Sequence, residues 1–185
     1  MFDFIADHPV LDFVATVSER RTRPADRLTG PADLDAWVHE SGLRPGLPPI
    51  SAAGFAHAVD LREAAFALIS AAIDGTAPDP AALAVVNAAA AAAPPTVALG
   101  ADLTVRRSGD LDAVLAALAR DCVELLGGTD RALLHWCADA TCTRPYVDRS
   151  RGARRRWCGM RGCGDRAKAA AYRRRRAVPG RAVSG

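Results

Sequence analysis

The sequence lacks the features that mark secreted and membrane-spanning proteins. Its longest weakly apolar stretch, Ala81 to Ala93, contains Asn87 and is too short to span a bilayer. The first ten residues, MFDFIADHPV, carry acidic residues where a secretory signal needs basic ones. Lysine is nearly absent, since Lys168 stands alone beside 23 arginines, a bias typical of a GC-rich genome. We therefore expect a cytoplasmic protein without membrane association.

Motifs of common enzymes are also missing. The sequence has no glycine-rich phosphate loop, no Gly-x-Ser-x-Gly turn and no His-Glu-x-x-His pair. Its four histidines are scattered at His8, His39, His57 and His135. The one mixed acid and imidazole cluster in the sequence consists of Asp7, His8 and Asp12. We expect that the protein is not an enzyme, with an activity of unrecognised type in the N-terminal part as an alternative.

Charge is divided unevenly along the chain. Residues 1–136 carry 10 arginines and 18 acidic residues, a balance of −8, whereas residues 137–185 carry 14 basic and 3 acidic residues, a balance of +11. The sum is the net charge of +3. An acidic part joined to a basic part indicates an anionic partner for the basic part. The alternative is that the two parts only neutralise each other.

Residues 1–130, called the body below, have the pattern of an α-rich domain with a few strands. Residues 8–17 (HPVLDFVATV) alternate branched or aromatic residues with small or polar ones and predict a strand. Residues 96–107 predict a β-hairpin that turns at Gly100 and Ala101. Caps and apolar periodicity predict four helices, at 31–40, from Ser51 to Asp74, from Pro80 to the double proline at 94–95, and at 111–126.

Apolar positions on these helices predict the core of the body. Leu34, Trp37 and Val38 share one face of the first helix. On the long second helix, the inward candidates are Phe55, Val59, Phe66 and Ile73. The last helix has an apolar stripe that includes Cys122, which we interpret as a buried core residue.

The other four cysteines lie in one 27-residue window, as two Cys-x4-Cys pairs separated by fifteen residues. They are Cys137, Cys142, Cys158 and Cys163. Four thiolates at such spacings favour a structural zinc ion, which prefers tetrahedral sulfur ligands. A redox pair normally has the spacing Cys-x2-Cys, and a catalytic zinc needs an open position that four cysteines do not leave. Four unrelated cysteines are the remaining alternative.

The local pattern around the cysteines predicts a small treble-clef-like zinc finger at residues 131–178, called the finger below. Cys137 and Cys142 form a knuckle after the apolar run ALLHW, and PYVD pairs back as a hairpin strand. Cys163 then opens a helix, where exposed N–H groups favour a thiolate. The fold class is therefore α+β, with an α-rich body and this finger. Residues 179–185 are expected to be a disordered tail.

The segment RRRWCGMRGCGDRAKAAAYRRR resembles the CGNR zinc finger, and HPVLDFVATV with DLDAWVHESGL resembles the opening of the ABATE domain that precedes this finger. The resemblance implies a bacterial transcription regulator described as stress-induced. Two positions depart from the family pattern. Asp165 replaces the asparagine of the finger's name, which argues against a phosphate contact there, and Ala15 stands where asparagine is common. We expect Asp165 to accept hydrogen bonds from backbone N–H groups of the first helical turn.

Basic residues of the finger are the candidates for binding nucleic acid. They are Arg154, Arg155, Arg156, Arg166, Lys168, Arg173, Arg175 and Arg176. Arginine binds phosphate and guanine with two parallel hydrogen bonds, so duplex DNA is the expected partner, and Arg166 in the first helical turn is the candidate for a base contact. The alternatives are a solvated charged helix, or an RNA-binding or protein-docking module. For the body, we expect a role in sensing a small-molecule effector or in forming a homodimer.

Overall fold

A computed structural model describes residues 2–43 and 47–177 of this protein. The body contains α1 (Pro9–Val14), β1 (Val17–Ser18), β2 (Ala25–Asp26), α2 (Pro31–Ser41), α3 (Ala52–Asp74), α4 (Pro80–Ala91), β3 (Thr96–Leu99), β4 (Val105–Ser108) and α5 (Leu111–Gly127). A short helix η1 (Thr129–Leu133) follows, and then β5 (Leu134–Trp136), β6 (Pro145–Val147), η2 (Met160–Gly164) and α6 (Asp165–Ala177). The described strands pair as three antiparallel hairpins, which confirms an α+β fold with a helix-rich body.

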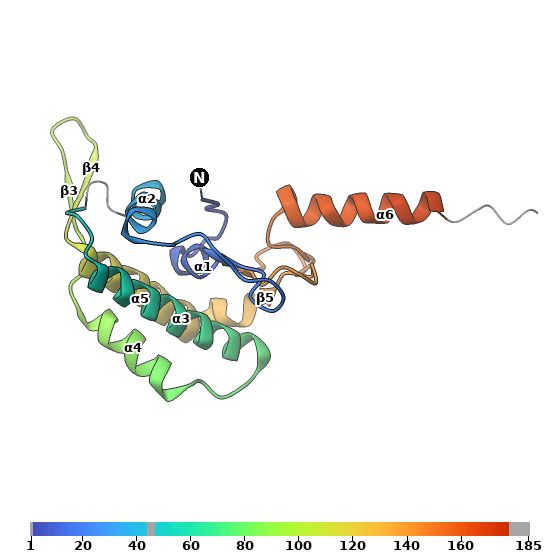
Figure 1. Cartoon of the computed structure of the whole chain (residues 1–185), viewed down its shortest axis with the longest axis horizontal. Helices are drawn as coiled ribbons and strands as arrows, with labels where there is room; N and C mark the ends of the chain where they lie inside the picture. Colours follow the sequence, from blue (N-terminus) through green and yellow to red (C-terminus); the bar gives the residue numbers. More distant parts are fainter. Residues whose placement is uncertain (1, 44–46, 178–185) are drawn as a thin grey trace, which may run out of the picture.

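The helices α3, α4 and α5 pack side by side, and α1 and α2 lie against α3 (Figure 1). Their ends follow the chemistry of the sequence. The Ser51 side chain accepts a hydrogen bond from the Gly54 N–H at the start of α3, and Gly75 ends the same helix at φ 68°, a conformation that favours glycine. The Asp79 carboxylate caps α4 in the same way. The helix predictions from capping are therefore confirmed.

The prediction of a strand at residues 8–17 is wrong. His8 has extended backbone angles, Pro9 occupies the first helical position, and α1 continues to Val14. Every residue from Val10 to Val14 is buried, so the chain is covered on all sides and its apparent alternation carries no information about a sheet face. A strand of two residues, Val17–Ser18, follows the helix.

The inward face predicted for α3 is only partly right. Phe55, Phe66 and Ile73 pack against the main core, but they are half-buried, as is Val59, and lie at its edge. The buried face instead carries smaller side chains such as Ala58, Leu61, Ala65, Leu68 and Ile69. The reason is that α3 lies between other helices, and small side chains let α1, α4 and α5 approach it closely.

The same helix buries an arginine that the sequence pattern does not reveal. Arg62 is 2% exposed, and its guanidinium donates to both carboxylate oxygens of Asp26 at 2.8 and 2.7 Å. It also donates to the hydroxyl of Thr16 at 3.1 Å and to Glu63 at 2.9 Å. These bonds fasten the loop between α1 and α2 onto α3.

The finger is continuous with the body in its packing. Leu134 of β5 and Val147 of β6 belong to the main hydrophobic core. Trp136 donates from its indole nitrogen to Asp74 at 2.7 Å and lies against Phe66, with ring centroids 5.9 Å apart. Beyond this contact, α6 points away from the body (Figure 1). The predicted disordered tail lies outside the described residues, and no described helix is both long and apolar enough to cross a membrane.

Candidate metal centre and nucleic-acid interface

The four cysteines of the finger meet in space. Their sulfur atoms all lie within 4.8 Å of one another, and Cys158 is 3.8 Å from both Cys142 and Cys163. A tetrahedral zinc ion with Zn–S bonds of about 2.3 Å holds its sulfurs about 3.8 Å apart. The four predicted ligands therefore lie together in one cluster, and its geometry suits zinc. Cys122 is separate from the cluster and fully buried in the body, as predicted.

Two tight turns present these sulfurs. In the first turn, the Cys142 N–H donates to the Asp139 carbonyl at 3.0 Å, and the Asp139 side chain accepts from the N–H of Thr141 at 3.1 Å. In the second turn, Gly162 has φ 96°, which places it in the region that favours glycine, just before Cys163. The paired strands β5 and β6 hold the first turn, and α6 begins directly after the second. The knuckle, hairpin and helix agree with the predicted zinc-finger layout.

The chemistry of the cluster suits a cation. Burial raises the pKa of the Cys163 thiol to about 12, and negative charge on Cys142 and Cys137 adds to this effect. Four thiolates at this separation repel one another, whereas a divalent metal ion stabilises all of them as anions. Cys137, Cys158 and Cys163 are buried, so the ion would be shielded from exchange with solvent.

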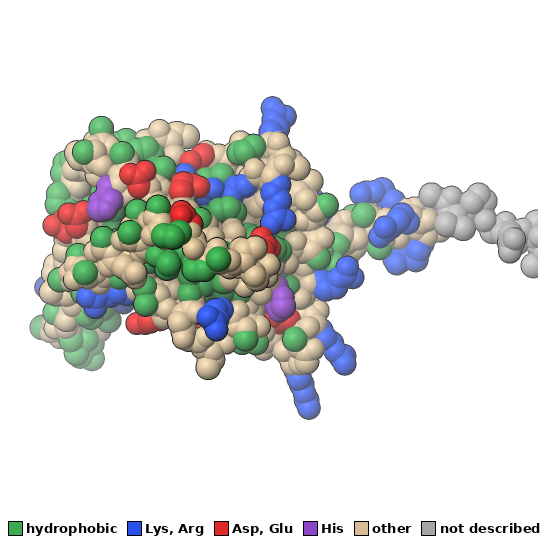
Figure 2. Space-filling model, turned by 90° about the horizontal axis from the view of Figure 1, so that it is seen from below, with side chains coloured by type: hydrophobic (Ala, Val, Ile, Leu, Met, Phe, Trp, Pro, Cys, Tyr) green, Lys and Arg blue, Asp and Glu red, His purple; other side chains and the backbone are tan. Residues whose placement is uncertain are grey.

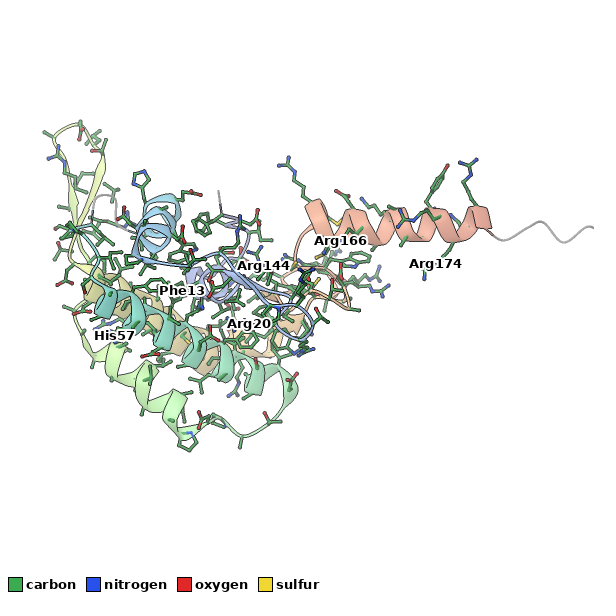
Figure 3. All side chains as sticks on the ribbon, in the orientation of Figure 1. Phe13, Arg20, His57, Arg144, Arg166 and Arg174 are labelled. Atoms are coloured by element: carbon green, nitrogen blue, oxygen red, sulfur yellow. The ribbon has the colours of Figure 1, made fainter. Side chains whose placement is uncertain are left out.

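Arg166, the predicted base contact, is engaged within the finger. Its guanidinium donates to the Cys163 sulfur at 3.0 Å and to the Asp139 carboxylate at 2.9 and 3.0 Å. It therefore joins the first turn of α6 to the Cys137–Cys142 knuckle. Hydrogen bonds from outside the ligand set orient metal ligands and tune their charge. Although bonded in this way, the Arg166 side chain remains 60% exposed. Figure 3 shows Arg166 at the end of α6 that meets the sulfur cluster.

Arg155, in contrast, is turned inward. It is half-buried, its guanidinium donates to the carbonyls of Trp157 and Cys158, and it lies 4.6 Å from the ring centroid of Tyr146. The backbone N–H of Arg155 donates to buried Asp148 at 3.0 Å. These bonds shape the loop that leads to Cys158, so Arg155 supports the cluster from within.

The remaining predicted nucleic-acid residues are exposed. They are Arg154, Arg156, Lys168, Arg173, Arg175 and Arg176. Sequence analysis did not single out Arg151, Arg161 and Arg174, which are exposed in the same region, although the density of arginine there was the available signal. Most Lys and Arg side chains in this view gather at the end of the molecule that carries α6 (Figure 2), and Arg174 lies near the far end of that helix (Figure 3).

A hollow of about 490 Å³ lies in the loop that contains Cys158, and we call it the basic hollow. It is lined by Ser150, Arg151, Arg154, Arg155, Arg156, Trp157, Gly159 and Met160. Among the described residues, the lining includes four arginines and no acidic residue, so the hollow can receive an anionic group such as a phosphate. Asp165 stands apart from this lining. Its exposed carboxylate lies 3.7 Å from the ammonium of Lys168. Within the described part of the chain, it does not accept the hydrogen bonds that we expected from backbone N–H groups of the first helical turn.

The acidic and imidazole side chains near the N-terminus make contacts that stabilise the fold. His8 contacts Asp121 at 2.7 Å and Asp130 at 3.1 Å. Burial alone would lower the pKa of His8, but its hydrogen bonds to these two carboxylates raise it. Asp12 is buried, and its carboxylate accepts from the N–H groups of Ile5 and Ala6. Both side chains are thus occupied in holding the N-terminal segment in place.

The arrangement agrees with comparisons to known families. Residues 7–129 match ABATE, described as "Putative stress-induced transcription regulator", and residues 134–176 match the CGNR zinc finger. The first match covers more than half of the chain, and the second contains all four clustered cysteines. Among curated proteins, none matches the chain.

Proposed function

Since this chain belongs to the ABATE family of transcription regulators and carries a CGNR zinc finger, we propose that it regulates transcription by binding duplex DNA through the finger. Zinc, held by Cys137, Cys142, Cys158 and Cys163, is a structural ion in this proposal. It fixes α6 to the knuckle and leaves no coordination position for a substrate.

One observation carries the proposal: α6 leaves the body with its basic side chains exposed. Lys168 and the run from Arg173 to Arg176 are all exposed, and the four consecutive arginines point around the helix. Figure 1 shows no other element alongside the outer part of α6. A cationic helix of this kind can enter the major groove or lie along the phosphate backbone of a duplex.

The geometry separates two groups among the arginines of the finger. Arg155 and Arg166 are bonded within the finger, so their contribution is to position the loop and helix. We propose that the phosphate contacts come from the exposed group, Arg154, Arg156, Lys168, Arg173, Arg175 and Arg176, with the basic hollow as a further anion site.

A direct test is fluorescence anisotropy of a labelled, random-sequence duplex titrated with the zinc-loaded protein at several salt concentrations. The affinity should fall log-linearly with salt, because each neutralised phosphate releases condensed counterions. Replacing Arg173 and Arg175 by alanine should reduce the slope by about one unit per lost contact. The matched control replaces Arg106 and Arg107 on the hairpin β3–β4, two exposed arginines of the body, and should leave the slope unchanged.

Two outcomes would overturn this proposal. Absence of duplex binding at low salt favours a protein-docking function for the same surface. Preference for single-stranded RNA over the duplex in competition favours an RNA-binding function.

For the body, we propose a regulatory role. It packs on the finger through Leu134, Val147 and Trp136, so a change in the body reaches the strands that hold the knuckle. Binding of an effector or formation of a homodimer are the two ways in which the body can act.

A further inference from the structure

A groove of about 580 Å³ lies between α3, α4 and α5. This volume falls in the range of roughly 300–1,000 Å³ that is usual for small-molecule sites. Leu68, Val86 and Cys122, one from each helix, are buried in its wall. Leu83 and Val123 stand at the groove with 38% and 44% of their surfaces exposed. The groove is therefore apolar and open to solvent.

The composition of α4 explains why the groove exists. This helix is rich in alanine, whose methyl groups fill little of the space beside α3 and α5. Its far end is fixed, because Arg120 of α5 donates to the carbonyls of Ala90 and Ala92 at 2.9 and 3.0 Å. The groove lies along the other half of α4, where the 75–79 loop connects it to α3 (Figure 1).

Three polar side chains line the groove from three different segments. Thr76 belongs to the loop before α4, Asn87 to α4 and Arg131 to η1. Within residues 2–43 and 47–177, no hydrogen bond or ion pair is found for any of these three side chains. Arg131 is the one charged residue of the lining in that part of the chain. An apolar wall with a single unpaired cation favours an apolar anion.

We infer that this groove binds a small apolar carboxylate, with the hydrocarbon part between the helices and the carboxylate on Arg131. Binding of the carboxylate does not depend on the proposed regulator function. Only the assignment of the groove as the effector site rests on that function. The neighbour of Arg131 in η1, Asp130, accepts hydrogen bonds from His8 and from Arg149 of the finger. A ligand that moves Arg131 therefore acts on the segment that joins body and finger.

The test uses octanoate and 4-phenylbutyrate as probes, with octan-1-ol as the uncharged match to octanoate. Calorimetry on the full zinc-loaded chain should show both carboxylates binding more tightly than the alcohol. Nitrogen-15 NMR should place the largest shifts in residues 75–79 and 129–133. Arg131→Gln should weaken octanoate binding about tenfold and leave octan-1-ol unchanged, because only a charge-assisted contact is lost.

Two further variants control for misfolding and for general charge. Arg107→Gln removes an exposed arginine that is not part of the groove lining and should leave octanoate binding unchanged. Leu83→Ser combined with Val123→Ser should weaken both octanoate and octan-1-ol, since both lose apolar contact at exposed positions that the fold tolerates.

The inference is overturned if neither carboxylate binds, if Arg131→Gln and Arg107→Gln behave alike, or if the shifts map elsewhere. Unchanged duplex affinity at saturating octanoate would overturn the effector assignment. If the carboxylates bind as expected while the parent protein does not bind DNA, the proposed regulator function fails and the groove stands.

Discussion

The body and the finger are each stabilised by a different kind of interaction. Among the described residues, the main core contains 25 buried residues, of which two come from the finger hairpin. The finger's own cluster contains four, three of them cysteines. Burial of apolar surface stabilises by about 25 cal/mol per Å², so the body has ample stabilisation from packing. The finger has too few apolar side chains for this and depends on its metal.

Arginine occurs in two kinds of environment. In the body, Arg62 is buried and bound to Asp26, and Arg20 lies 4.0 Å above the ring of Phe66. In the outer half of α6, the arginines are exposed and carry no carboxylate partner within the described residues. The comparison shows that arginine serves as an internal cross-link in the body and around the cysteine cluster, and stands exposed along the outer half of α6.

Loss of zinc should have the largest effect, because it should unfold the finger and leave the body folded. Cys163→Ala should remove the metal and unfold the finger, because zinc supplies roughly 10–16 kcal/mol to folding in zinc-finger peptides. The body should keep its cooperative thermal transition. Metal analysis and circular dichroism of the purified protein measure both effects. Cys122→Ala is the matched control and should retain one zinc, since Cys122 lies outside the cluster. A finger that stays folded without metal would contradict the comparison.

Removal of the finger should have the next largest effect. A chain that ends at Gly128 should still unfold cooperatively, as expected for an independent domain. Its free energy of unfolding should be lower by about 3 kcal/mol, because Leu134 and Val147 no longer cover the core. Urea denaturation of the truncated and full chains measures the difference. A truncated chain without a cooperative transition would mean that body and finger form one folding unit.

Arg166→Ala tests whether the arginine beside the cluster is structural. Loss of its bonds to Cys163 and Asp139 should speed zinc release to a chelator about tenfold, as is usual for residues that orient metal ligands. Arg174→Ala, in the outer part of the same helix, should release zinc at the parental rate. Equal rates of zinc release for the two variants would mean that Arg166 does not support the cluster. It would then belong with the arginines proposed to contact nucleic acid.

The smallest expected effect is a pH dependence at the junction of body and finger. The folded protein raises the pKa of His8 above 6.5, so the protonated form is stabilised by folding. This contribution is complete below pH 6.5 and is lost as the pH rises through the raised pKa. The free energy of unfolding should therefore decrease over that interval. His8→Gln should flatten this dependence, and a parent protein with no such decrease would show that the contacts to Asp121 and Asp130 do not favour the charged imidazole.

The parts of the structure that local chemistry determines could be predicted from the sequence. Ser51, Asp79 and Gly75 mark helix ends by bonds within a few residues, and the cysteine spacing indicates the metal cluster directly. The segment from Val10 to Val14 could not be assigned, because a short, fully buried apolar run has no exposed face to show its period.

Partners that are distant in sequence account for the other differences. Arg62 is buried because Asp26 and Thr16 reach it from a loop about 40 positions away, which no local pattern shows. Arg155 sits in a run of three arginines, and only the fold of the finger distinguishes it from its exposed neighbours. Charge density therefore indicated where basic residues gather, without identifying which of them are bonded within the finger.

The attachment of α6 at one end makes this helix a lever. It has 13 residues, and at about 1.5 Å per residue it extends roughly 20 Å from the turn that bears Cys163. A rotation of about 10° at the metal-bound end therefore moves the distal arginines by roughly 3 Å. Adjacent phosphates on one DNA strand are spaced by about 3.4 Å along the helix axis. A slight rotation at the four-cysteine cluster is thus amplified into a displacement of the helix tip that is comparable to this phosphate spacing.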